Sequence, residues 1–317
     1  MEIFKETPKI DWIGQRYKFF VVSGILVAAS FVSLATKGLN YGIEFTGGSL
    51  IQASFEESVS IDSVRADVSR AGYEGASIQQ FSNSNTFAIR LKASAESSAE
   101  LIDKFVKDFE SVNATRKFRV DKKEYIGPVV GRHLYRQALI AVILSLVGIL
   151  VYVAFRFDNA LWGVGGILAL AQDVITMFGL YSILGLEFDL TAVAAVLTVA
   201  GFSINDTIVI FDRMREKLRS MYNDPLEAVI NASLNETMSR TIITSGTVFM
   251  TVLALDFLGG PGIRGFSIAM TWGVLEGIYS TIAIATPFVF QWTQMRGRGK
   301  PPQPVAAPVQ GPRTKRR

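Results

Sequence analysis

The chain has 317 residues, of which 49% are hydrophobic and 19% are charged, and its formal net charge is +4. The apolar residues lie in long blocks, which excludes an ordinary soluble enzyme. The chain has no cysteine, so disulfides and thiolate nucleophiles or metal sites are excluded, and the single histidine, His133, argues against a histidine-based metal site. We therefore expect a membrane protein without metal or other cofactors.

Six stretches are long and apolar enough to cross a membrane, since a spanning helix needs about 20 predominantly apolar residues. They comprise residues 19–36, 136–155, 161–184, 190–211, 240–258 and 265–291. No convincing cleavage site follows the first stretch, so we expect a retained span rather than a signal peptide.

Lysine and arginine concentrate beside alternate ends of these spans, which indicates the orientation. They occur in segments 1–18, 212–239 and 292–317, whereas the loop at 185–190 contains Glu187 and Asp189 and no basic residue. We expect both termini in the cytoplasm. The long segment 37–135 then lies on the opposite side of the membrane.

The segment 37–135 has the pattern of a small folded domain. The stretch SLIQASFEE alternates like a strand, and Ser60 is a candidate N-cap for the helix that follows. Two short strands around the turn NSN, a helix with Leu101, Phe105 and Phe109 on one side, and a last strand complete the order β-α-β-β-α-β. This order predicts a ferredoxin-like α+β domain, a fold that specifies no function by itself.

Two further segments lie outside the spans. Residues 212–239 are amphipathic, with a break at Asp224-Pro225, and predict two short helices on the membrane surface. The tail, residues 292–317, is rich in proline and basic at its end. We expect it to be disordered. Its basic end fits contact with anionic membrane lipids or with the ribosome, but a solvated topology anchor is the favoured role.

The sequence GFSINDTIVIF places Asn205 and Asp206 inside the fourth span. A carboxylate at the centre of a membrane helix costs about 2.5–3.5 kcal/mol, so some group must compensate for it. Arg240, at the start of the fifth span, is the candidate cation, with help from Asn205 and from a hydrated seam shared with Asp173 of the third span.

Hydroxyl and small residues accompany these charges. Thr244, Thr247 and Thr251 share one face of the fifth span, and Gly166, Ala169 and Thr176 lead along the third span past Asp173. The set is consistent with a proton relay or with a structural ion pair that fixes helix packing. Asp212 fits the membrane edge beside Arg213, and Glu276 is interpreted as facing a partner subunit.

Several of these stretches resemble the SecF family of the RND superfamily. The matching stretches are YGIEFTGGSLI, EYIGPVVGRHL, AQDVITMFGL, VAGFSINDTIVIFDRMRE, ETMSRTIITSGTVFMTVLAL and FLGGPGIRGFS, and together they follow the chain over residues 10–295. The resemblance implies a multi-pass protein of the bacterial inner membrane, with six spans in an RND-like half-bundle, one periplasmic domain and both termini in the cytoplasm.

The resemblance also implies a function. Such a subunit pairs with SecD and assists protein export through the SecYEG channel after the SecA motor, using the proton gradient to pull unfolded chains outward. It is not an enzyme, and no nucleic acid is expected among its partners. The implied relay residues are Asp206, Arg240 and Asp173, and the motif after the first span contains Glu44, Gly47 and Gly48.

The chain departs from the family pattern at three positions. Gln172 stands where the family usually has histidine, Glu44 where it usually has aspartate, and Glu276 is unusual in a sixth span. Two alternative functions stay open: a structural subunit without its own relay, and half of an RND-type small-molecule exporter, against which the single small external domain argues.

Overall fold

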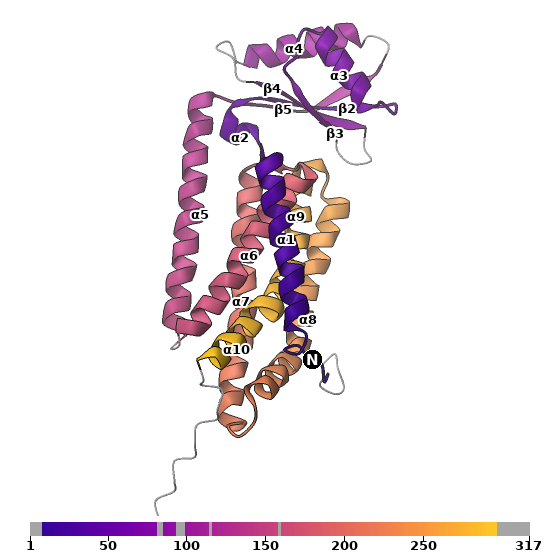
Figure 1. Cartoon of the computed structure of the whole chain (residues 1–317). Coiled ribbons are helices and arrows are strands. Elements are labelled where there is room, and N and C mark those ends of the chain that lie inside the picture. Colours follow the sequence, from indigo (N-terminus) through magenta and orange to yellow (C-terminus); the bar gives the residue numbers. More distant parts are fainter. Residues whose placement is uncertain (1–7, 81–84, 93–98, 114–115, 158–159, 297–317) are drawn as a thin grey trace, which may run out of the picture.

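The computed structural model describes residues 8–80, 85–92, 99–113, 116–157 and 160–296. In this part of the chain, a bundle of long helices has a small sheet domain at one end (Figure 1). The predicted turn NSN and the tail from residue 297 lie outside the described residues.

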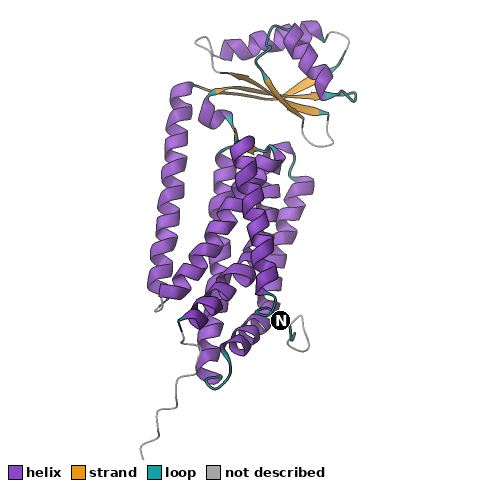
Figure 2. Cartoon of the chain, in the orientation of Figure 1, coloured by secondary structure: helices purple, strands orange, loops and turns teal. Residues whose placement is uncertain are grey.

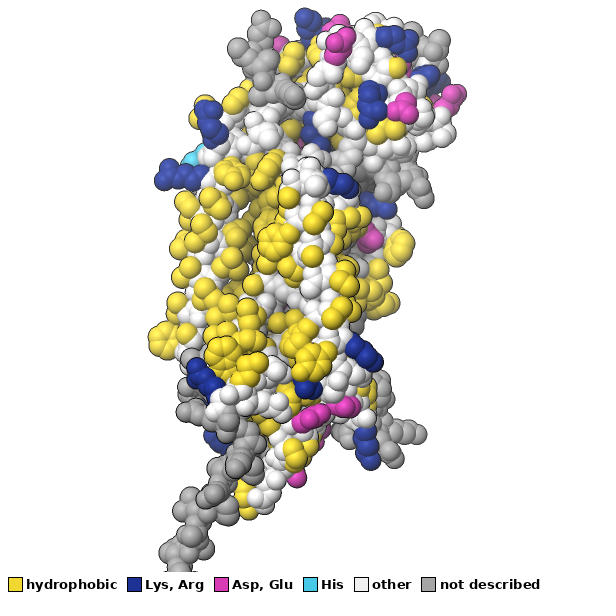
Figure 3. Space-filling model, in the orientation of Figure 1, with side chains coloured by type: hydrophobic (Ala, Val, Ile, Leu, Met, Phe, Trp, Pro, Cys, Tyr) yellow, Lys and Arg dark blue, Asp and Glu magenta, His cyan; other side chains and the backbone are white. Residues whose placement is uncertain are grey.

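Six helical segments of the described chain are long and apolar enough to cross a membrane, as predicted. They are α1 (Arg16–Thr36), α5 (Pro128–Arg156), Leu161–Leu184 within α6 (Ala160–Leu184), α7 (Leu190–Ser220), α8 (Leu226–Leu258) and Arg264–Met295. Apolar side chains cover the middle of the surface, and charged side chains lie toward its two ends (Figure 3). A belt of this kind matches the apolar interior of a bilayer.

The last of these segments is not one regular helix. It consists of α9 (Arg264–Ser280), a π-helical turn at Thr281–Ala285 and α10 (Thr286–Met295). Thr281 in the π-helical turn is within hydrogen-bond distance, 2.9 Å, of Thr207 on α7. The irregular turn therefore lies in the interior of the bundle, where π-helical turns often mark functional positions.

The sheet domain has the predicted order of elements. Its elements are β2 (Gly48–Phe55), α3 (Ile61–Arg70), β3 (Ser77–Gln80), β4 (Thr86–Lys92), α4 (Ala99–Val112) and β5 (Phe118–Ile126). The strands form one antiparallel sheet in the order β3-β4-β2-β5. Both helices lie on the face of the sheet that points away from the bundle (Figure 2).

The alternation of β2 explains this arrangement. Ile51, Ala53 and Phe55 are buried against the two helices, where Phe105 and Phe109 also pack. Ser60 caps α3 as predicted, because its side chain accepts a hydrogen bond from the backbone N–H of Ser63. The assignment of this domain to the ferredoxin-like fold itself stays a prediction.

Short elements connect the sheet domain to the bundle. Strand β1 (Asn40–Tyr41) pairs in parallel with β6 (Glu187–Phe188), which directly precedes α7. Helix α2 (Ile43–Thr46) then leads into β2 through Gly47, whose φ of 72° favours glycine. A Cβ on Gly47 would lie 2.9 Å from the Cα of Pro128, so this glycine also permits close approach to the start of α5.

The helix break predicted at Asp224-Pro225 is confirmed, but the helices on either side of it are not the two short ones predicted over residues 212–239. Helix α7 continues without a break to Ser220, and α8 begins at Leu226, directly after the predicted break at Asp224-Pro225. The apolar sides of the two extensions pack on each other through buried residues such as Met214 and Leu234. The amphipathic pattern therefore reflects an antiparallel helix pair rather than contact with a membrane surface.

Candidate functional site: polar residues inside the helix bundle

Asp206 lies on α7 in the interior of the bundle and is 4% exposed. Its carboxylate accepts a hydrogen bond of 3.4 Å from the Ser245 hydroxyl on α8. A buried carboxylate needs such a donor, because its desolvation otherwise goes uncompensated. The bond joins two of the long helices at the predicted site.

Asp173 lies on α6 and is completely buried. The Ser203 hydroxyl of α7 donates a hydrogen bond to its Oδ2 atom, whereas Oδ1 has no hydrogen-bond partner among the described residues. Ser203 and Asp206 are three residues apart and therefore share one face of α7. Helix α7 thus connects the two aspartates, because it carries Asp206 itself and contacts Asp173 through Ser203.

The sequence analysis interpreted Glu276 as facing outward, toward a partner subunit, but the structure places it inside the bundle. It is buried on α9, and the side-chain amide of Gln172 on α6 donates a hydrogen bond of 2.8 Å to its Oε1 atom. Gln172 precedes Asp173, so the glutamate belongs to the same buried polar region. The interpretation of Glu276 as a contact to a partner subunit is wrong, because α6 provides its partner within the chain.

The structure does not bring Arg240 into contact with Asp206. Within the described chain no ion pair joins them, and Arg240 is exposed. Asn205 is exposed on α7 as well. The direct compensation of Asp206 comes from Ser245, which spacing alone did not identify.

Thr244 and Thr247 are also exposed on α8. Each donates its hydroxyl hydrogen bond to the carbonyl four residues earlier, Arg240 and Ile243 respectively. These hydroxyls therefore satisfy themselves within their own helix. Together with Arg240 and Thr251, they give α8 a polar outer stripe within its membrane-spanning part.

The motif after the first span lies outside the bundle core. Glu44 is on α2, beneath the sheet domain, and its Oε2 atom is buried without a hydrogen-bond partner among the described residues. Burial raises the pKa of Glu44, and the carboxylates of Asp189, Glu187 and Glu124 raise it further. Gly47 and Gly48, at φ of 72° and 136°, form the turn from α2 into β2.

The sequence contained a signal for the contact between Gln172 and Glu276, although residue spacing alone did not predict it. Gln172 and Glu276 are both departures from the family pattern, and the structure joins them by a hydrogen bond. Two unusual polar residues in separate spans indicate a contact, because each needs a polar partner in the apolar interior.

Comparison with known proteins agrees with these features. The family model for the protein export membrane protein SecD/SecF C-terminal region matches residues 106–295, and the SecD/SecF GG motif matches residues 32–59. Protein translocase subunit SecF of Calditerrivibrio nitroreducens is 38% identical over 94% of this chain and 99% of its own. The SecF subunit of Pseudomonas aeruginosa is 39% identical over 93% of this chain and 95% of its own.

A solved structure has the same architecture. The crystal structure of SecDF from Thermus thermophilus, described as a translocon-associated membrane protein, matches with a TM-score of 0.82 and 37% identity. The match covers 92% of this chain but 40% of the solved one. This chain therefore corresponds to less than half of the length of SecDF.

Six membrane-spanning segments with buried carboxylates, and a sheet domain after the first span, define a multi-pass membrane protein of the RND-like half-bundle class. The family models and the relatives that match almost the whole chain narrow this class. The chain belongs to the SecF family of protein translocase subunits.

Proposed function

We propose that this chain, as a SecF-type subunit, works beside a SecD-type partner and uses the proton gradient to assist protein export. Its further partners are the SecYEG translocon, the SecA motor and the unfolded polypeptides that they export. It resides in the bacterial inner membrane with both termini in the cytoplasm, which puts the sheet domain in the periplasm. It acts without catalysing a chemical reaction on its clients.

The observation that carries this proposal is the run of polar contacts across the bundle. Asp173 and Ser203 link α6 to α7, and Asp206 and Ser245 link α7 to α8. Carboxyl and hydroxyl groups that follow one another through a membrane domain suit the transfer of protons. A proton that crosses the full membrane potential releases about 2.3 kcal/mol per 100 mV, which is the energy that the subunit would use.

The exposed polar residues support a partner within the membrane. Asn205, Arg240, Thr244 and Thr247 lie on the outside of the single chain, where lipid offers no hydrogen bonds. A SecD-type bundle packed on this face would enclose them near Asp206. They complete the relay in the assembled complex, with Arg240 as the cation that responds to the charge of Asp206.

The test is Asp206→Asn in the complex with its SecD-type partner. Asparagine keeps the size and accepts the Ser245 bond but cannot release a proton. The variant should assemble and lose the stimulation of export by the proton gradient, measured in vesicles with and without an uncoupler. Arg240→Met should have the same effect.

Asp212→Asn is the matched control. Asp212 lies on the same helix at the edge of the bundle, where it forms an ion pair with Arg156 and is partly exposed. Such pairs contribute little, so this variant should keep its response to the gradient. Full stimulation of a well-assembled Asp206→Asn complex would eliminate the relay and leave a structural subunit.

A further inference from the structure

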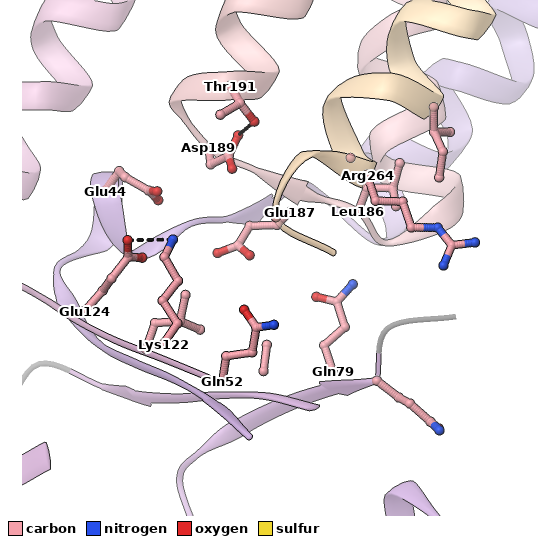
Figure 4. Close-up of a pocket in the computed structure, with 16 residues that line it drawn as sticks. Glu44, Gln52, Gln79, Lys122, Glu124, Leu186, Glu187, Asp189, Thr191 and Arg264 are labelled. Atoms are coloured by element: carbon pink, nitrogen blue, oxygen red, sulfur yellow. Dashed lines mark hydrogen bonds and ion pairs between the residues drawn. The ribbon is translucent and has the colours of Figure 1, made fainter. Parts of the chain in front are cut away.

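A cavity of about 130 Å³ lies between the sheet domain and the adjoining end of the bundle. Gln52 of β2 and Gln79 of β3 point into it from the sheet, and Glu187 points into it from the opposite side (Figure 4). Cavity and surrounding side chains form a seam along which the two parts of the protein meet.

The seam is rich in charge. Its charged groups are the carboxylates of Glu44, Glu124, Glu187 and Asp189 and the cations of Arg90, Lys122 and Arg264. Lys122 pairs with Glu124 at 2.6 Å within β5. Arg90 of β4 pairs with Glu187 of β6 and so joins the sheet domain directly to the bundle.

The Arg90 side chain is only 8% exposed. Its remaining contact is a hydrogen bond of 3.3 Å to the side-chain oxygen of Gln79, and its Nε atom has no partner among the described residues. A buried cation depends on its partner, because removal of one member leaves an uncompensated charge. Arg90 therefore stays buried only while the sheet remains on Glu187.

The segment that contains Glu187 leads directly into α7, the helix that carries Asp206. Asp189, two residues after Glu187, caps α7 by accepting a hydrogen bond of 2.7 Å from the backbone N–H of Ala192. A movement of the sheet domain that pulls on Glu187 thus acts on the first turn of α7. The seam is the direct mechanical connection between the sheet domain and this helix.

No ion pair of Glu44 with a cation is found among the described residues, and its Oε2 atom is buried. A Cβ added to Gly42 would lie 2.4 Å from Glu44 Oε2 and 3.2 Å from Glu187 Oε1, so the two carboxylates converge on one glycine. We propose that the seam is a proton-sensitive latch, in which Arg90 and Glu187 hold the sheet domain on the bundle and protonation of Glu44 removes the repulsion that opposes closure.

The direction of the pH effect follows from linkage. The pKa of Glu44 is raised while the seam is closed, and it returns toward the ordinary value of about 4.3 when the sheet moves away and exposes the carboxyl. The closed seam therefore binds the proton more tightly than the open one. Closure is strongest at low pH and weakens as pH rises through the raised pKa of Glu44.

Two effects oppose each other at Glu187. Burial raises its pKa, whereas the Arg90 guanidinium lowers it. Glu187 is therefore the holding group and Glu44 the sensing group. The physiological reading of the latch, in which an acidic periplasm closes it, rests on the orientation proposed above, but its test requires neither export nor a gradient.

The chain contains no cysteine, so spin labels can be placed freely. Ser77→Cys on β3 and Lys37→Cys after α1 provide two exposed sites, one on each side of the seam. The full chain, with a cysteine-free SecD-type partner in lipid nanodiscs, is labelled at both sites. Pulsed electron paramagnetic resonance then gives the distance distribution between about pH 8 and about pH 5.

The short-distance population should grow as the pH falls. Glu44→Gln should give that population at every pH, because glutamine resembles the protonated acid. Arg90→Gln should reduce the population throughout yet keep the pH response, since Glu44 remains. Glu110→Gln, an exposed carboxyl on α4 far from the seam, is the control and should behave as the unsubstituted chain.

Two results would overturn the latch: distances in the unsubstituted chain that do not change with pH, or a Glu44→Gln variant that keeps the full pH response. Neither depends on Asp206. A failed latch therefore leaves the proposed export function standing, and the converse also holds.

Discussion

At the scale of single residues, each buried carboxyl of the bundle has its own polar neighbour. Asp206 has Ser245, Asp173 has Ser203 and Glu276 has Gln172. Each of these bonds joins two different helices. The polar residues therefore specify which helices lie together as well as which groups can carry charge.

The bond between Gln172 and Glu276 predicts a non-additive pair of substitutions. Gln172→Leu should lower the unfolding free energy by about 1–3 kcal/mol, because it leaves a buried carboxyl without its donor. The double variant Gln172→Leu/Glu276→Leu should recover most of this loss, since neither polar group remains. Thermal unfolding of the purified complexes measures both effects, and additive losses would show that the bond contributes nothing.

The sequence identified Asp206 and Asp173 as buried charges but did not identify Ser245 and Ser203, the residues that contact them. The spacing of Arg240, Thr244 and Thr247 correctly puts them on one face of α8, yet that face points outward. Periodicity shows which residues share a face, but both sides of a membrane helix are apolar enough to face either lipid or protein. The rotation of α8, and with it the role of Ser245, is determined only by packing.

At the scale of elements, the sequence predicted which helices and strands are present better than how far each helix extends. The six spans and the strands of the sheet domain follow from length and alternation. The extension of α7 and α8 into an antiparallel pair does not, because an amphipathic face fits a membrane surface and a neighbouring helix equally well. Ion pairs of Glu236 on α8 with Arg213 and Lys217 on α7 reinforce the pair.

The turn between α2 and β2 predicts a sensitive glycine. Gly47→Ala should destabilise the chain by more than about 1 kcal/mol, because φ is positive and the added Cβ would meet the Pro128 backbone at 2.9 Å. Gly75→Ala is the control, since among the described residues other than its chain neighbours no atom lies within 4 Å of its Cβ position. Limited proteolysis at rising temperature should separate the two variants, and equal resistance would contradict the close approach.

At the scale of the whole molecule, the proposed orientation puts the sheet domain and the α7–α8 turn on opposite sides of the membrane. In the cysteine-free chain, Glu110→Cys should react with an impermeant thiol reagent added outside cells with a permeable outer membrane. Ser220→Cys, at the end of α7, should react only after the inner membrane is opened. Labelling of position 220 from outside would reverse the orientation.

The outer polar stripe of α8 makes the isolated chain an incomplete structure. Lipid offers neither a counter-charge nor hydrogen bonds to the exposed Arg240 side chain, so the chain expressed alone should be degraded or self-associate. Co-expression with a SecD-type subunit should yield a stable complex. Pulse-chase stability and gel filtration of the solubilised protein measure this dependence.

Leucine substitutions in the polar stripe of α8 distinguish loss of the partner interface from a general loss of stability of the chain. Thr244→Leu/Thr247→Leu makes the outer face apolar and removes hydroxyls that bond only within α8. The variant should persist longer alone and co-purify with several-fold less partner, since its face now suits lipid. Met250→Leu, an exposed apolar position on α8, should change neither quantity. Undiminished co-purification of the double variant would move the partner interface away from α8.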